Sequence, residues 1–280
     1  MSILSEYKRK KDFLVCVDSD GCAMDTMDCK HIHCFGPCMV TEWGLEQWKD
    51  QILSRWNDIN LYTMTRGINR FKGLNMMLTE VNEQYTPIQA LADLTAWVNS
   101  GAAPSNDALQ KAIDETDSPI LKKAMSWSKA VNAAIVDLPE ELKKPFPGAK
   151  DGLAAASAIA DVAIVSSANR DAVMEEWTKH KLLDHVDIVL AQDMGSKAHC
   201  IEEMLKFGYA PDHVLMCGDA PGDMDAAKQN GVLYFPIRVR QEKESWDQFV
   251  GEALGHLQDG TYAGQYQQAV IDAFLANLGG

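Results

Sequence analysis

Short apolar runs recur near the start of the chain and throughout its second half. They occupy residues 13–17, 162–165, 186–190, 214–217 and 232–235, and helical patterns lie between the last four, at 171–180, 196–207 and 223–230. A short, continuous apolar run bounded by polar residues is typical of a buried parallel strand. Strands that alternate with helices of ten to fifteen residues predict an α/β fold, a Rossmann-like, doubly wound parallel sheet with helices on both faces.

The segment between the first two runs has a different pattern. Its apolar residues recur at helical spacing in four stretches, 42–56, 68–81, 87–98 and 120–136. Several prolines then punctuate the return to the strand pattern. We therefore expect an all-helical domain at 26–144, inserted after the first strand of an α/β core formed by 1–25 and 145–280. The last segment, 260–280, is expected to form a peripheral helix.

Composition narrows the class of protein. The chain has 280 residues, 46% hydrophobic and 24% charged, which is typical of a globular protein. Its 40 acidic and 26 basic residues give a formal charge of −14, which argues against nucleic-acid binding. No apolar stretch is long enough to predict a membrane span, and the N-terminus has no secretory pattern. Seven cysteines, an odd number, favour reduced thiols and a cytoplasmic location.

Acidic residues follow the first and the fourth strand of the predicted core. Asp18 and Asp20 come directly after the first run, and Asp219 and Asp223 after the fourth, beside Gly218. The carboxyl ends of parallel strands lie at one edge of a sheet, where ligands bind. Carboxylate and carbonyl oxygens suit a hard cation, so these acids predict a Mg²⁺ site. The alternative is that they only form strand-ending turns.

Residues suited to an anion follow the second and third strands. Ser166 and Ser167 stand where the second strand gives way to a helix, and hydroxyls and backbone N–H groups there can bind an anion. Lys197 opens the helix after the third strand and would bring an ammonium group to the same edge. Alternatively, Ser166 only caps a helix.

These four groups, in this order, resemble the motifs of the haloacid dehalogenase-like superfamily of phosphohydrolases. The matching residues are Asp18-Ser19-Asp20-Gly21, Ser166, Lys197 and Gly218-Asp219 with Asp223. The resemblance covers the core, and the helical insertion corresponds in position and type to the family's cap domain. Cys22 stands where the family usually has Thr or Val.

The resemblance implies a phosphohydrolase that works through an aspartyl-phosphate. Asp18 would be the nucleophile, and Asp20 would protonate the leaving alkoxide and then deprotonate water. Ser166, Ser167 and Lys197 would bind the phosphoryl oxygens.

The resemblance also implies the ligands of a Mg²⁺ ion. They are a carboxylate oxygen of Asp18, the backbone carbonyl of Asp20 and the carboxylate of Asp219. Asp223 would act through a bound water or by orienting Lys197.

We therefore predict that the protein is a Mg²⁺-dependent phosphatase that acts on a small phosphorylated metabolite. Asp20 favours phosphate esters over dehalogenation, because a halide leaving group needs no proton, and a helical cap favours small substrates. Two alternatives remain open: a phosphomutase of the same superfamily, and a non-catalytic protein that binds a phosphorylated ligand. The sequence does not indicate an oligomeric state.

Two features of the predicted insertion carry hypotheses of their own. Cysteines and histidines are dense between Cys22 and Cys38, which suggests zinc, but their spacing fits no standard finger and packing is the preferred interpretation. Arg66 and Arg70, four apart, could clamp an anionic substrate, or they could form surface ion pairs with Glu42 or Glu46.

Overall fold

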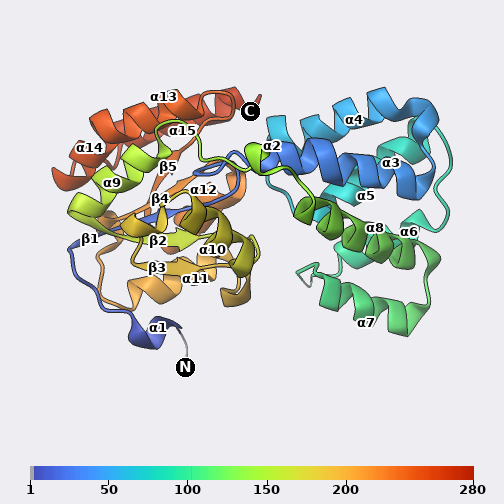
Figure 1. Cartoon of the computed structure of the whole chain (residues 1–280), viewed down its shortest axis with the longest axis horizontal. Helices are drawn as coiled ribbons and strands as arrows, with labels where there is room; N and C mark the ends of the chain where they lie inside the picture. Colours follow the sequence, from blue (N-terminus) through green and yellow to red (C-terminus); the bar gives the residue numbers. More distant parts are fainter. Residues whose placement is uncertain (1–2, 102) are drawn as a thin grey trace. The chain divides into compact units, whose positions relative to one another are not determined.

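The computed structural model describes residues 3–101 and 103–280. The chain divides into two compact units (Figure 1): one combines Met1–Met27 with Glu140–Gly280, and the other is Asp28–Pro139. We call them the core unit and the helical unit. Within the described residues, none of the helices has the length and apolar character that crossing a bilayer requires.

A five-stranded parallel sheet forms the centre of the core unit. Its strand order is β3-β2-β1-β4-β5. The strands are β1 (Phe13–Val17), β2 (Ala160–Val165), β3 (Ile188–Leu190), β4 (Val214–Gly218) and β5 (Leu233–Pro236). Each apolar run of the sequence forms one of them, which confirms the predicted α/β fold. From β1, the chain adds β2 and β3 on one side and then β4 and β5 on the other, so the strand order switches between β1 and β4. Ligands bind at such a switch point in doubly wound sheets.

Helices cover both faces of this sheet. On one face α9 packs against β2 and against α13 and α14, and on the other α11 and α12 pack together beside β4. Alternate strand residues serve the two faces, so that Val15 and Val17 join the apolar cluster that includes Leu153 of α9. The core-unit helices are α1 (Ile3–Glu6), η4 (Glu140–Leu142), α9 (Ala149–Ile159), α10 (Arg170–Lys179), η5 (Leu183–His185), η6 (Gln192–Met194), α11 (Lys197–Leu205), η7 (Pro211–His213), α12 (Pro221–Asn230), α13 (Glu242–Gln248), η8 (Phe249–Ala253), α14 (Leu254–Gln258) and α15 (Gln265–Asn277).

The helical unit packs around an aromatic centre. The Trp127 ring contacts those of Phe35, Trp56 and Phe71 at centroid distances of 6.0–6.1 Å, and Trp127 Nε1 donates to the Phe35 carbonyl. Its helices are η1 (His31–Phe35), α3 (Gly36–Trp43), η2 (Glu46–Trp48), α4 (Lys49–Asn57), η3 (Asp58–Tyr62), α5 (Arg70–Gln84), α6 (Leu91–Val98), α7 (Asn106–Thr116) and α8 (Pro119–Val136), and α2 (Met27–Lys30) crosses the boundary between the units.

Two helical predictions need correction. The segment 42–56 is not one helix, because Gly44 takes a left-handed conformation (φ 66°) that ends α3 before α4 begins. The helix predicted from residue 87 begins only at Leu91, since Ala90 before it has a φ of 59°.

Candidate active site

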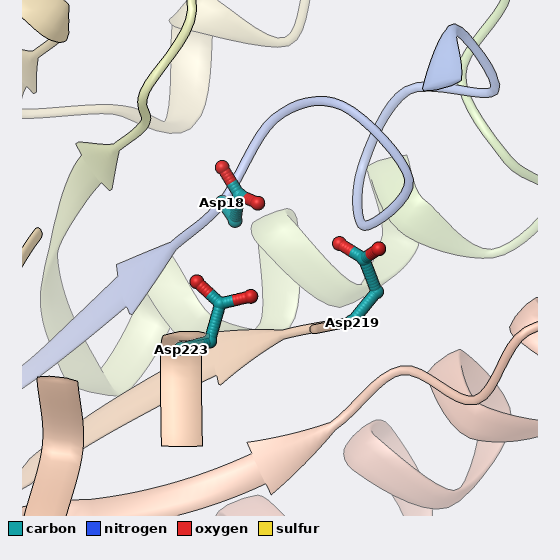
Figure 2. Close-up of side chains that lie close together, drawn as sticks. All are labelled: Asp18, Asp219 and Asp223. Atoms are coloured by element: carbon teal, nitrogen blue, oxygen red, sulfur yellow. The ribbon is translucent and has the colours of Figure 1, made fainter. Parts of the chain in front are cut away.

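Three buried carboxylates meet at the switch point of the sheet (Figure 2). Asp18 directly follows β1, Asp219 follows β4, and Asp223 lies in the first turn of α12. One carboxylate oxygen from each lies within 4.8 Å of the others. Strand order explains why Asp18 and Asp219 meet, because β1 and β4 are neighbours and their carboxyl ends share one edge of the sheet, and the first turn of α12 adds Asp223.

Lys197 joins two of these acids. Its Nζ donates to Asp18 Oδ2 at 2.6 Å and to Asp223 Oδ1 at 2.5 Å. Lys197 begins α11, and Ser196 caps that helix by accepting from the backbone N–H of His199 at 3.2 Å. The cap fixes where the helix starts, and therefore where the ammonium group enters the cluster.

Backbone N–H groups orient two of the carboxylates. Asp18 Oδ1 accepts from the N–H of Ser19 at 2.7 Å, and Asp223 Oδ2 accepts from the N–H of Ala220 at 3.1 Å. Gly218 allows Asp223 its place, since a Cβ there would lie 2.3 Å from the Asp223 Cγ. The Gly at this position is therefore required by close approach, which its lack of a side chain permits.

The electrostatics of the cluster are unbalanced. Burial raises the pKa of Asp18 to about 8, helped by Asp223 and Asp219 and opposed by Lys197. Burial alone would lower the pKa of Lys197. The attraction of Asp18 and Asp223 outweighs this effect of burial and raises the pKa of Lys197 above its usual value. When all three carboxylates are ionised, the single ammonium leaves a formal surplus of two negative charges in a buried place. A divalent cation would balance that surplus, and an all-oxygen donor set suits Mg²⁺, so the residues present fit the metal.

Asp20 lies outside this cluster of side chains. Its carboxylate accepts from the Thr26 hydroxyl at 2.6 Å and is half-buried. The turn that carries it is tight: Gly21 has a φ of 85° and donates to the Met24 carbonyl at 2.8 Å. Asp20 therefore has a fixed carboxylate two residues beyond Asp18 in the same loop.

The serines after β2 have different environments. Ser166 is buried, and its hydroxyl accepts from the backbone N–H of Ala168 at 3.1 Å, whereas Ser167 is exposed. Asn169 caps α10, and Arg170 pairs with Asp193 at 2.8 Å, so these two residues have structural partners.

Sequence reasoning missed two residues that support the site. Thr26 holds Asp20, and the Trp177 indole donates to the Ser19 hydroxyl at 2.9 Å. Thr26 is polar yet fully buried. Neither contact follows from a sequence pattern, because both join residues that only the folded chain brings together.

The two arginines of the helical unit have separate partners. Arg66 is 2% exposed, donates to the Leu61 carbonyl at 2.7 Å and lies 3.8 Å from Asp28. Arg70 donates to Ser128 and Asn132, at 3.2 and 2.8 Å. Asp28, rather than Glu42 or Glu46, is the acid beside Arg66.

The zinc cluster considered for residues 22–38 does not form among the described residues. In the two described ranges, the Asp18, Asp219 and Asp223 group is the one set of three potential ligands close enough to share an ion. His31 Nδ1 accepts from the Trp56 indole at 3.2 Å, and Cys22 Sγ lies 4.0 Å from Cys217 Sγ. Cys22, Cys29 and Cys34 are buried, which agrees with the packing interpretation, whereas His33 is exposed.

Comparison with known proteins decides the family. The family model described as "Haloacid dehalogenase-like hydrolase" matches residues 81–236, more than half of the chain. The chain belongs to the haloacid dehalogenase-like hydrolases. The matched segment contains Ser166, Lys197, Asp219 and Asp223, while Asp18 lies before it. No curated protein matches the chain.

Solved structures of this hydrolase fold resemble the chain at low identity. A protein from Lactobacillus delbrueckii subsp. bulgaricus, named as a candidate phosphoglycolate phosphatase, is 14% identical with a TM-score of 0.51, over 80% of this chain and 85% of that one. A haloacid dehalogenase-like family hydrolase from Xanthomonas campestris is 12% identical with a TM-score of 0.50, over 91% and 97%. These likenesses establish the fold of the family and carry no argument about the substrate.

Proposed function

We propose that this hydrolase is a Mg²⁺-dependent phosphatase of small phosphorylated metabolites. The observation that carries the proposal is the meeting of Asp18, Asp219 and Asp223 within 4.8 Å, with Lys197 hydrogen-bonded to two of them. Family membership supports a hydrolase, and the name of the Lactobacillus structure is consistent with phosphatase chemistry.

Asp18 is the proposed nucleophile. Its carboxylate attacks phosphorus, the ester oxygen leaves, and an aspartyl-phosphate forms that water then hydrolyses. Lys197 lies against Asp18 at 2.6 Å, so its ammonium would stabilise charge on the phosphoryl oxygens as they approach. The Ser166 hydroxyl and the exposed Ser167 are the proposed neutral contacts to those oxygens.

Asp20 is the proposed general acid and base. It donates a proton to the leaving alkoxide and removes one from the attacking water. Thr26 donates to Asp20 Oδ1 at 2.6 Å, which fixes the position of the carboxyl group.

The proposed ligands of Mg²⁺ are the carboxylates of Asp18, Asp219 and Asp223 and the backbone carbonyl of Asp20. When bound, the ion would supply positive charge that offsets the repulsion between a phosphoryl dianion and the Asp18 carboxylate. The surplus of negative charge in the cluster supports this assignment.

The helical unit is the proposed cap, with Arg66 and Arg70 as proposed contacts to an anionic substrate. Arg70 suits that role better than Arg66. The hydrogen-bond partners of Arg70, Ser128 and Asn132, are neutral, whereas Arg66 already lies beside the acidic Asp28. All seven cysteines are thiols outside any disulfide, which supports the proposed cytoplasmic location, where thiols stay reduced.

A substrate panel tests the proposal. The protein would be assayed with Mg²⁺ against sugar, nucleotide and small organic phosphates, with Asp20→Asn as the control. Release of inorganic phosphate that Asp20→Asn loses supports a phosphatase. Transfer of the phosphoryl group to a second hydroxyl would instead identify a phosphomutase, and binding without turnover would identify a non-catalytic phospho-ligand protein.

A further inference from the structure

A cavity lies in the core unit, and none of the residues of the aspartate cluster lines it. It has a volume of about 450 Å³, and its walls include Pro236, Arg238, Gln248, Glu252, Tyr266 and Val270. These residues come from the end of β5, from α13 and η8, and from α15, which packs against β5. The volume falls in the range of small-molecule sites. Glu252 lies on η8, a π-helical turn, and such turns are frequent at functional sites.

Tyr266 brings a buried hydroxyl group to this cavity. Its ring is held by stacking on His256 at a centroid distance of 4.1 Å and by an edge contact with Tyr262 at 5.1 Å. The hydroxyl oxygen is buried and, among the described residues, makes no well-formed hydrogen bond, although Glu252 and Gln248 lie close enough to influence it. Burial and then Glu252 raise the pKa of Tyr266 to about 12, so the hydroxyl keeps its proton. A buried hydroxyl without a partner is costly, which points to a polar ligand group.

Two opposite charges line the same cavity without pairing with each other. The Arg238 side chain has no hydrogen-bonding or ion-pairing partner within residues 3–101 and 103–280. Its backbone is fixed, because its N–H donates to the Ser245 hydroxyl at 3.1 Å. Glu252 accepts from Gln248 Nε2 at 3.0 Å through one carboxylate oxygen, which leaves the other available. The cavity thus offers one cation, one anion and a hydroxyl.

The remaining walls are apolar. Pro236 and Val270 are buried, and two alanines of α15, Ala269 and Ala273, complete this side. A ligand that matches all these walls needs an anionic group for Arg238, a cationic group for Glu252 and a compact apolar body. A simple carboxylate would leave Glu252 facing a like charge, and a simple amine would leave Arg238 unmatched.

We propose that this cavity binds an α-amino acid with an apolar side chain. The carboxylate accepts from the Arg238 guanidinium, the ammonium donates to Glu252 and to the Tyr266 hydroxyl, and the side chain packs against Pro236 and Val270. The site is separate from the proposed phosphatase centre, so its occupancy does not depend on the chemistry proposed there.

Calorimetric titration of the full chain with L-leucine, L-methionine and L-phenylalanine tests the proposal. At least one should bind with saturation at one site per chain. For a binding amino acid, the analogue without its ammonium group and the analogue without its carboxylate should each bind roughly tenfold more weakly or worse. For leucine these analogues are 4-methylpentanoate and 3-methylbutylamine. The absence of saturable binding by all three amino acids would overturn the proposal.

Paired variants assign the contacts. Arg238→Gln should weaken the amino acid roughly tenfold or more and leave the amine unchanged, while Glu252→Gln should weaken the amino acid and leave the carboxylate unchanged. Arg240→Gln, an equal charge change at an exposed position outside the cavity, is the matched control. Asp18→Asn should bind the amino acid as the wild type does. Equal binding by wild type and Arg238→Gln, or loss of binding in Asp18→Asn, would contradict the assignment.

Discussion

Lys197 Nζ lies 2.6 Å from Asp18 Oδ2, although the two residues are 179 positions apart in the chain. The pairing depends on strand order: β1 lies between β2 and β4, Asp18 directly follows it, and α11 begins close to the same edge. The same ammonium also reaches Asp223, so one lysine connects the acid after β1 with the acid that opens α12.

Asp18→Asn should abolish phosphatase turnover while the fold is kept, because an amide cannot serve as the nucleophile. We expect kcat with p-nitrophenyl phosphate and Mg²⁺ to fall by roughly a thousandfold or more. Asp225→Asn, at an exposed aspartate on α12, is the matched control and should retain activity. Undiminished hydrolysis by folded Asp18→Asn would refute the assignment of the nucleophile.

Metal-free protein should lose stability as the pH rises. The folded state raises the pKa of Asp18 to about 8, so it holds a proton that the unfolded chain releases near pH 4. The free energy of unfolding should therefore fall between about pH 4 and about pH 8.

Thermal unfolding after EDTA treatment, at about pH 5 and about pH 8, measures this effect. Asp18→Asn should show a smaller drop in Tm than the wild type, and Mg²⁺ should raise the wild-type Tm most at the higher pH. Identical pH dependence in the two proteins would show that Asp18 does not carry the effect.

Gly218→Ala should displace the Asp223 side chain from the acidic cluster. The new Cβ would lie 2.3 Å from Asp223 Cγ, so Asp223 must move away from Lys197. We expect a loss of about 1–3 kcal/mol in the free energy of unfolding, measured by urea denaturation, together with lower kcat. Gly222→Ala is the control, since nothing lies within 4 Å of a Cβ there. Equal effects of the two substitutions would argue against this steric account.

Thr26→Val should impair proton transfer by Asp20. The substitution keeps the shape of the side chain and removes the hydroxyl that donates to Asp20. We expect kcat to fall roughly tenfold and the pH profile of kcat to shift, with KM little changed. Thr26→Ser keeps the hydroxyl and should restore both values towards those of the wild type. A change in KM alone would mean that Thr26 does not act through Asp20.

The sheet and the acidic cluster were predictable for a simple reason. A strand such as 162–165 is an unbroken apolar run, and acids directly after such runs must lie at the carboxyl edge of a parallel sheet. The sequence places Asp223 at this edge and suggests that it orients Lys197, but the close approach of its carboxylate to Asp18 and Asp219 depends on the first turn of α12.

Other parts of the fold depend on tertiary packing. The helix α7 was not predicted, and Leu109 is its one buried residue. The helices from 242 to 258 were also missed, although Trp246 packs fully buried against the core and donates to the Cys22 carbonyl at 3.1 Å. The partners of Arg66 could not be derived, because Asp28 and Leu61 reach it only through the packing of the helical unit.

The most direct test of the central claim is a titration with Mn²⁺, followed by the EPR signal of the free ion and by its displacement with Mg²⁺. We expect one Mn²⁺ site per chain, from which Mg²⁺ displaces the bound Mn²⁺. The affinity for Mn²⁺ should fall roughly tenfold or more in Asp219→Asn and stay unchanged in Asp225→Asn. Binding that Asp219→Asn leaves intact, or no stoichiometric site in the folded wild type, would contradict the claim that these aspartates hold a divalent ion.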